Sequence, residues 1–129
     1  MYEQETNGVI IRAEPSFLEG ESTADRLVWA YTIEIENCSN RGVQLLRRHW
    51  RITDAHGRTQ EVHGDGVIGE QPVIEPGEAF SYSSFCPLAA PSGWMAGEYD
   101  MADLETGDVF AAIIPPFALD SPNAASRAN

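Results

Sequence analysis

The chain contains no lysine, and all eight of its basic residues are arginines. Aspartate and glutamate together number 20 in 129 residues, so the formal net charge is −12 and the isoelectric point lies near 4.4. An acidic surface keeps a protein soluble and argues against general binding to nucleic acid or to anionic membranes. We therefore expect no nucleic-acid partner.

Cysteine is scarce as well, since Cys38 and Cys86 are the only two. No apolar run approaches the roughly 20 residues that a membrane span requires. The N-terminal stretch MYEQETNGVI lacks the basic segment and the apolar run of a signal peptide. These features predict a cytoplasmic protein without a membrane span, whose thiols stay reduced and mostly structural.

The chain does contain many short segments with the alternating pattern of β-strands, separated by turn signals about every 8–12 residues. Seven or more strands and no significant helix predict an all-β fold, an antiparallel β-sandwich of immunoglobulin-like type. The length indicates one domain. We place it at residues 9–119, after a frayed N-terminus (1–8) and before a disordered tail (120–129).

One of these strands has two faces that follow directly from its alternation. Over Leu27 to Asn37, one set of alternating side chains is apolar and predicted to face the core, and the other is polar and predicted to face solvent. The core set is Trp29, Tyr31, Ile33 and Ile35, and the solvent set is Thr32, Glu34 and Glu36. Near the end of the chain, Val109 to Ile114 predicts a last strand that Pro115-Pro116 stops.

The strongest signal is a hairpin that begins with Val43 to Asp54. Asp54-Ala55-His56-Gly57 has the residues of a type I turn closed by a left-handed glycine. This turn predicts a register with the opposed pairs Thr53/Thr59, Arg51/Glu61, Trp50/Val62, His49/His63 and Arg47/Asp65. A two-residue His56-Gly57 loop is the competing turn, but it would mix the apolar and polar faces.

The preferred register gives the first strand of the hairpin an apolar face and a charged face. Leu46, Trp50 and Ile52 lie on the apolar face, which Arg48 interrupts, and the other face carries Arg47, His49, Arg51 and Thr53. Five of the eight arginines lie in or just before this hairpin. They form either a basic strip or, as we prefer, a ladder that Glu61, Asp65 and neighbouring carboxylates neutralise.

The segment that follows has the glycine spacing GxGxxG, at Gly64, Gly66 and Gly69. In a nucleotide-binding βαβ unit such glycines precede a helix that holds phosphate, but here Pro72 follows within three residues and no amphipathic helix is present. The context favours a strand bent by glycines and bulges. The alternative is a phosphate or pyrophosphate site made by the backbone amides of this loop with Arg47, Arg48 or Arg51.

The opposed histidines suggest a second kind of site. His49 and His63, with Glu61 or Asp65 diagonally adjacent, offer imidazole and carboxylate ligands that suit a first-row divalent ion. Two histidines are too few for a closed structural zinc site, and no CxxC or HxxxH spacing accompanies them. We expect no cofactor, and at most weak binding of Co²⁺ or Mg²⁺ at His49 and His63.

Catalytic patterns are weak throughout the chain. Ser83, Ser84 and Cys86 are candidate nucleophiles, but the sequence has no GxSxG elbow and places no histidine–aspartate pair beside them. We therefore expect a protein that is not an enzyme.

Several runs together resemble one known family. VQLLRRHWRITDAHG, EVHGDGVIGEQPVIEPGEAFSYSS, CPLAAPSG, MAGEYDM and IPPFAL are similar, in this order, to the ApaG family (the DUF525 domain). The resemblance extends from about Val9 to Leu119. It implies a sandwich of fibronectin type III or immunoglobulin-like type. Bacterial members are associated with cobalt resistance and magnesium efflux, and eukaryotic ones are fused in F-box and polymerase-interacting proteins, which implies protein–protein interaction.

The resemblance carries over no catalytic residue. The family's glycine motif maps onto Gly64, Gly66 and Gly69, while Asp65, Arg47 and Phe85 stand where the family more often has Glu, Ser and Gly. We expect an interaction module that acts in cation efflux or resistance through a protein partner, as a monomer or as a weak oligomer formed by sheet-edge pairing. Exposure of Val67, Ile68 or Trp94 beside the glycine loop would favour this hypothesis.

Overall fold

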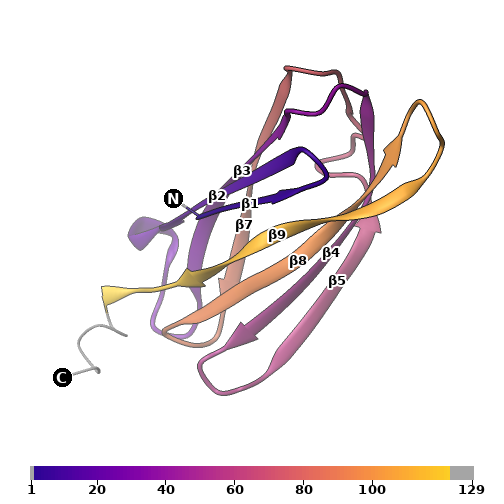
Figure 1. Cartoon of the computed structure of the whole chain (residues 1–129). Coiled ribbons are helices and arrows are strands. Elements are labelled where there is room, and N and C mark those ends of the chain that lie inside the picture. Colours follow the sequence, from indigo (N-terminus) through magenta and orange to yellow (C-terminus); the bar gives the residue numbers. More distant parts are fainter. Residues whose placement is uncertain (1, 123–129) are drawn as a thin grey trace.

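The computed structural model describes residues 2–122 and folds them into two antiparallel sheets that pack face to face (Figure 1). One sheet has the order β1-β2-β3-β7, and the other has the order β5-β4-β8-β9, with β6 paired to β4. The strands are β1 (Tyr2–Thr6), β2 (Val9–Phe17), β3 (Leu27–Asn37), β4 (Val43–Asp54), β5 (Thr59–Asp65), β6 (Val73–Ile74), β7 (Ala79–Leu88), β8 (Gly93–Asp103) and β9 (Val109–Leu119). A 3₁₀ turn, η1 (Glu19–Glu21), lies between β2 and β3.

The predicted all-β sandwich is thus confirmed, and the immunoglobulin-like or fibronectin-like type stays a prediction. The chain changes sheets from β3 to β4, from β6 to β7 and from β7 to β8, so the strands of each sheet come from distant parts of the sequence. Within residues 2–122, no helix is long and apolar enough to cross a membrane.

The core lies between the sheets and is made by alternate residues of their strands. On β3 the predicted core residues Trp29, Tyr31, Ile33 and Ile35 are all buried, while Thr32 is exposed. The indole of Trp50 meets Tyr31 edge-on at a ring distance of 5.3 Å and also contacts Tyr99 and Phe117. Such edge-to-face packing adds to the apolar burial that stabilises the sandwich.

The hairpin of β4 and β5 has the register that the turn predicts. All five predicted pairs occur, from Thr53/Thr59 to Arg47/Asp65. The Asp54 side chain accepts hydrogen bonds from the backbone N–H groups of His56 and Arg58, and Gly57 adopts a φ of +82°. These contacts define the turn and thereby the alignment of the two strands.

The predicted inner face of β4 is wrong at Leu46. A bulge between Leu45 and Arg47 interrupts the pairing with β8. Val43 and Leu45 are therefore buried before the bulge and Trp50 after it, while Leu46 is only half-buried. A bulge adds one residue to a strand and so exchanges its faces, which strict alternation cannot anticipate.

Two further predictions about the ends of the chain are also wrong. Residues 2–6 are not frayed but form β1, which pairs with β2 from Tyr2/Ala13 to Thr6/Val9. β9 does not stop at Pro115-Pro116 but continues to Leu119 through a register shift. Proline is tolerated there because β9 is an edge strand, whose outward positions need no donor. Residues 123–129 of the predicted tail lie outside the described residues.

Candidate functional site

An open groove of about 490 Å³ lies on the outer face of the sheet formed by β4, β5 and β8. Six of its eight lining residues are among those that the sequence predicts for binding, while Gly66, Gly69, Arg51 and Glu61 lie outside this lining. Its lining residues are Arg47, Arg48, His49, His63, Gly64, Asp65, Glu98 and Asp100.

Strand pairing explains why these side chains meet. After the bulge, the residues of β4 that point outward are Arg47, His49 and Arg51, as the hairpin predicts. Pairing with β5 sets His49 opposite His63, and pairing with β8 sets His49 opposite Glu98. Each outward residue of β4 thus lies between a neighbour on β5 and a neighbour on β8.

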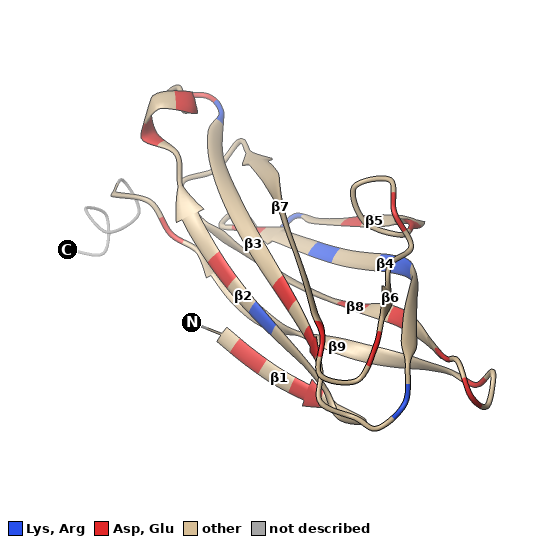
Figure 2. Cartoon of the chain, turned by 90° about the horizontal axis from the view of Figure 1, so that it is seen from above, with Lys and Arg blue, Asp and Glu red and all other residues tan. Residues whose placement is uncertain are grey.

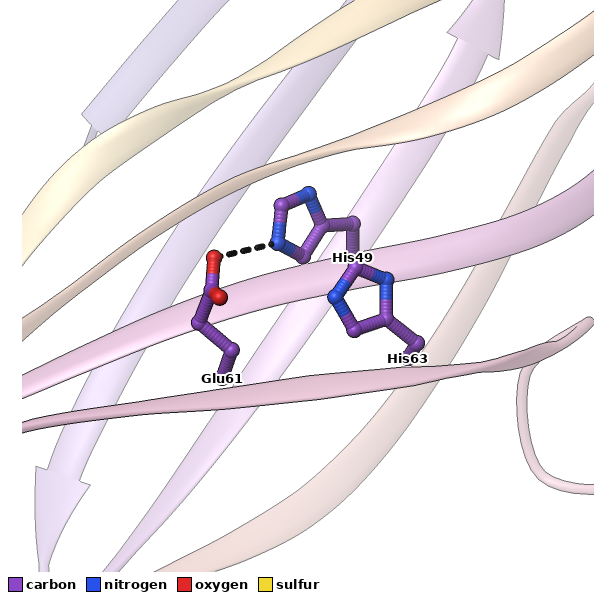
Figure 3. Close-up of side chains that lie close together, drawn as sticks. All are labelled: His49, Glu61 and His63. Atoms are coloured by element: carbon purple, nitrogen blue, oxygen red, sulfur yellow. Dashed lines mark hydrogen bonds and ion pairs between the residues drawn. The ribbon is translucent and has the colours of Figure 1, made fainter.

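The two imidazole rings stack in parallel, with centroids 4.0 Å apart and planes inclined by 16°. The ring of His49 also bridges two carboxylates. Its Nδ1 lies 2.5 Å from Glu98 Oε2. Its Nε2 lies 3.1 Å from Glu61 Oε1, the contact drawn as a dashed line in Figure 3. His49 is held from both sides, whereas His63 contributes its stacked face.

The arginines of β4 are all engaged. Arg47 donates to Asp100 at 3.0 Å and Arg51 donates to Glu98 at 3.1 Å, both across the β4–β8 pairing. The predicted neutralisation of the basic strip therefore occurs, but these two arginines form ion pairs with carboxylates of β8 rather than with Glu61 and Asp65. Sequence reasoning missed Glu98 and Asp100, although their alternation along β8 marked them as outward-facing.

Arg48 has a different role, because it binds the glycine loop. Its Nη1 donates to the backbone carbonyls of Asp65 (3.0 Å) and Gly66 (2.9 Å). Gly64 lies against the guanidinium, and a Cβ at position 64 would come within 2.7 Å of it. The first glycine of the motif therefore makes room for Arg48.

The rest of the loop is a tight turn. Val67 and Glu70 exchange two backbone hydrogen bonds of 2.9 Å around Ile68 and Gly69, which both have positive φ values (44° and 79°). This is the geometry of a type I′ hairpin turn. Gly66 (φ +61°) donates its N–H to Leu46 O, and a Cβ there would lie 2.0 Å from the carbonyl oxygen of Glu70.

The glycine motif thus has the geometry of the first alternative, a strand that bends at its glycines. The amides of Gly66, Val67 and Glu70 bond within the protein, and the three arginines of the predicted anion site are held by carboxylates and carbonyls. An anion would have to displace these contacts. Binding of phosphate or pyrophosphate at Gly64, Gly66 and Gly69 stays a prediction.

The predicted metal ligands do come together. His49, Glu61 and His63 each offer a ligand atom, and these atoms lie within 4.8 Å of one another. A metal bound at about 2.0–2.2 Å from nitrogen and oxygen requires its ligands to be at most about 4.4 Å apart. Small side-chain rotations would therefore bring the three atoms into one coordination sphere. Asp65, the other carboxylate considered, is not in this group.

Comparison with known proteins identifies the family. A family model described as the ApaG domain matches residues 18–103. The chain is 58% identical over 125 residues to Protein ApaG of Maricaulis maris (strain MCS10), covering 95% of each chain. It is 53% identical over 125 residues to Protein ApaG of Methylorubrum extorquens (strain PA1), again covering 95% of each.

A solved structure agrees with these relatives. The putative ApaA protein from Bordetella pertussis superposes with a TM-score of 0.85 at 40% identity, covering 88% of this chain and 94% of that chain. The sequence match and the structural match both extend over most of the sandwich. This chain belongs to the ApaG domain family.

Proposed function

We propose that the chain is a non-enzymatic binding module that acts in the handling of divalent cations, Co²⁺ or Mg²⁺, by contacting a protein partner. The observation that carries the proposal is the contrast between its surfaces. The charged side chains of the groove are largely paired with one another, whereas several large apolar side chains are more than half exposed. These are Ile68, Phe85, Trp94 and Val109.

The exposure that we named as favouring this hypothesis is present in part. Ile68 protrudes from the glycine loop at 59% exposure, but Val67 is buried. Trp94 is 60% exposed, yet it pairs with Thr53 at the opposite end of β8 from the loop. The apolar side chains therefore lie at separate places rather than in one patch.

Two of the three candidate nucleophiles, Ser83 and Cys86, support a role in binding rather than catalysis. The Ser83 hydroxyl bonds to that of Thr32 at 2.8 Å on the outer face of the first sheet. Cys86 is buried, and this burial raises the pKa of its thiol to about 11, which disfavours the reactive thiolate. Neither group lies in the groove of charged residues.

A growth experiment tests this function. The chain is expressed in a bacterium whose own ApaG-domain protein has been deleted, and growth in Co²⁺ and cellular Mg²⁺ content are measured. We expect restored Co²⁺ tolerance, retained by the double variant His49→Ala/His63→Ala if a partner carries the function. Unchanged Co²⁺ tolerance and unchanged Mg²⁺ content on expressing the wild-type chain would refute a role in cation handling.

Direct binding of a divalent metal is the second candidate, and the surroundings of His49 favour it. Metal-binding histidines usually donate their second ring N–H to a carboxylate, which orients the ring. Glu98 is placed to accept from Nδ1 of His49 and is itself held by Arg51. Nε2 then faces Glu61 and His63, which leaves a 2-histidine, 1-carboxylate set with open coordination positions.

Titration with Co²⁺ followed by amide NMR and visible absorption tests this site. We expect paramagnetic broadening centred on the three ligands, lost in His49→Ala/His63→Ala. His56→Ala is the matched control, because His56 is the third histidine and lies in the exposed β4–β5 turn. Equal Co²⁺ binding by the double variant and the wild type would reject the site.

A further inference from the structure

One sheet edge differs from the other edges of the sandwich. In the described part of the chain the edges are formed by β1 and β7 in one sheet and by β5 and β9 in the other, where the two-residue β6 lies on the same side of β4 as β5. Proteins usually protect such edges with charged residues, with proline or by covering them, because an open edge pairs with other strands. β1 carries Glu3 and Glu5, and β5 carries Glu61 and Asp65.

β9 is protected by being covered. β1 lies along it (Figure 1), and the side chains of β1 bond to its backbone. The N–H of Ile113 donates to Thr6 Oγ1, and the N–H of Ala118 donates to the Tyr2 hydroxyl. β7, with the sequence AFSYSSFCPL, has no charged residue at all, in a chain of which 22% is charged.

The backbone of β7 is open over most of its length. Asn37 of β3 bonds through both its N–H and its C=O to the chain just before β7. Every second residue of β3, counting back from Asn37, also directs its N–H and C=O groups toward β7. The β7 partners of these residues, Phe80, Tyr82 and Ser84, therefore form the backbone hydrogen bonds with β3. Ser81, Ser83 and Phe85 consequently turn their N–H and C=O groups outward. Pro87, which has no N–H, occupies the next outward position and ends the open segment.

A groove runs beside this edge. It has a volume of about 270 Å³ and opens between β7 and β5. Most of its lining residues are apolar or aromatic side chains of both sheets, including Tyr31, Trp50, Ile52, Val62, Cys86 and Met95, and Arg48, Gln60 and Ser84 add a polar part. A strand added to β7 would send every second side chain toward this groove, because successive side chains of a strand point to opposite faces.

Charge identifies the occupant. On the outer face of this sheet, Arg12 of β2 is shared by Glu3, Glu34 and Glu36 at 2.7–2.9 Å, so one guanidinium meets three carboxylates. Figure 2 shows the acidic positions in red along β1, β2 and β3 and a basic position in blue on β2. Glu34 and Glu36 lie opposite Ser81 and Ala79 of β7. This face is therefore negative and favours basic side chains on the outer side of an added strand.

Two other occupants fit less well. A second copy of this chain would bring a second net charge of −12 and the same acidic face to the joined sheet. The residues after 122, NAASRAN, include no large apolar side chain to enter the groove. We propose that β7 binds an extended segment of a partner protein by strand addition, with apolar residues toward the groove alternating with basic residues outward.

This inference rests on the proposed function and deepens it, because it names the surface and the chemistry of the partner. The probe is an eight-residue peptide in which valine alternates with lysine. The control peptide has the same composition, with residues of each kind placed in adjacent pairs. Both are titrated at physiological ionic strength into the full chain and followed by amide NMR.

Ser83→Pro removes an outward N–H without altering the bonds to β3, and Ser83→Ala is its matched control because both lose the hydroxyl bond to Thr32. We expect amide shifts over Ala79–Phe85, equal affinity for wild type and Ser83→Ala, and about tenfold weaker binding by Ser83→Pro. Should Ser83→Pro unfold, Ser83→Lys replaces it, since a lysine at this exposed site repels the peptide with little effect on folding.

Shifts centred elsewhere, equal binding of the two peptides, or full binding by a folded Ser83→Pro would overturn the assignment. A dimer in sedimentation that Ser83→Pro abolishes would overturn it in favour of a second copy. These results are separable from the growth test, because Co²⁺ tolerance restored by wild type and by Ser83→Pro alike would leave the proposed function standing without β7.

Discussion

Alanine substitution at each glycine of the loop separates a structural motif from a ligand cradle, because the three glycines serve different purposes. Among the three substitutions, Gly66→Ala is expected to lower the free energy of unfolding most. Its Cβ would lie 2.0 Å from Glu70 O, about 1 Å inside any tolerated contact. Removing this steric overlap must disturb the two backbone hydrogen bonds between Val67 and Glu70. Alanine in the left-handed backbone conformation costs about 1–2 kcal/mol, and each hydrogen bond contributes about 0.5–1.5 kcal/mol, so we expect the free energy of unfolding to fall by about 3 kcal/mol.

Gly69→Ala provides the internal comparison. Gly69 has a similarly positive φ of 79°, but a Cβ there meets nothing within 4 Å. Only the backbone strain of the folded state remains. Part of this loss is offset, because alanine lowers the conformational entropy of the unfolded chain. We expect a loss of about 1 kcal/mol.

Gly64→Ala acts through a side chain instead. Its φ is not positive, but its Cβ would displace the Arg48 guanidinium from the carbonyls of Asp65 and Gly66. We expect a loss of about 1–2 kcal/mol. In an Arg48→Ala background, the same substitution should cost little, because the displaced group is gone.

Urea unfolding followed by tryptophan fluorescence measures these differences from the midpoint, provided that the slope m is unchanged. A loss of unfolding free energy in Gly69→Ala as large as that in Gly66→Ala would contradict the steric role of Gly66. An equal loss in Gly64→Ala with and without Arg48 would contradict the role given to Gly64. A loss of stability that appears only with pyrophosphate present would instead assign the glycines to an anion site.

Three further predictions concern the core, the turn and the thiols. Tyr82→Phe should lower the free energy of unfolding by about 1–3 kcal/mol, because it leaves the fully buried Tyr99 hydroxyl without its partner at 2.6 Å. In urea unfolding, the double variant Tyr82→Phe/Tyr99→Phe should recover part of that loss, and additive losses would contradict this. Partial desolvation raises the pKa of Asp54, but hydrogen bonds from the turn outweigh it and the net pKa lies below its usual value. Its stabilisation is thus present above about pH 4 and lost as the pH falls below that, so the gap in thermal midpoint between wild type and Asp54→Asn should narrow on acidification; a constant gap would contradict the assignment. A disulfide-forming reagent should modify the exposed Cys38 in the native protein and the buried Cys86 only on unfolding; two thiols modified in the native state would exclude this core.

The hairpin shows how far local patterns reach. Asp54 and Gly57 define a turn whose hydrogen bonds form between residues at most four apart, so its chemistry is readable from the sequence. Once the turn is known, period two assigns every opposed pair of β4 and β5, including His49 and His63. The candidate metal ligands were accessible to sequence reasoning for this reason.

The bulge and the β8 contacts were not accessible in this way. The bulge between Leu45 and Arg47 depends on how β4 twists against β8. Glu98 lies 49 residues from His49 in the chain, and nothing local indicates which strand of the second sheet becomes its neighbour. The carboxylates that hold His49 and Arg51 therefore appear only in the folded protein.

The sequence by itself determined the all-β class, the faces of β3, the hairpin register and the family, because these follow from alternation, turn chemistry and motifs within short segments. Only the tertiary structure decided which edges are covered and which is open. Whether β1 covers β9 while the outer edge of β7 stays open depends on the packing of strands that are far apart in the chain. The charged groove on β4 and β8 arises in the same way, since pairing across the sandwich, rather than spacing along the chain, brings its residues together.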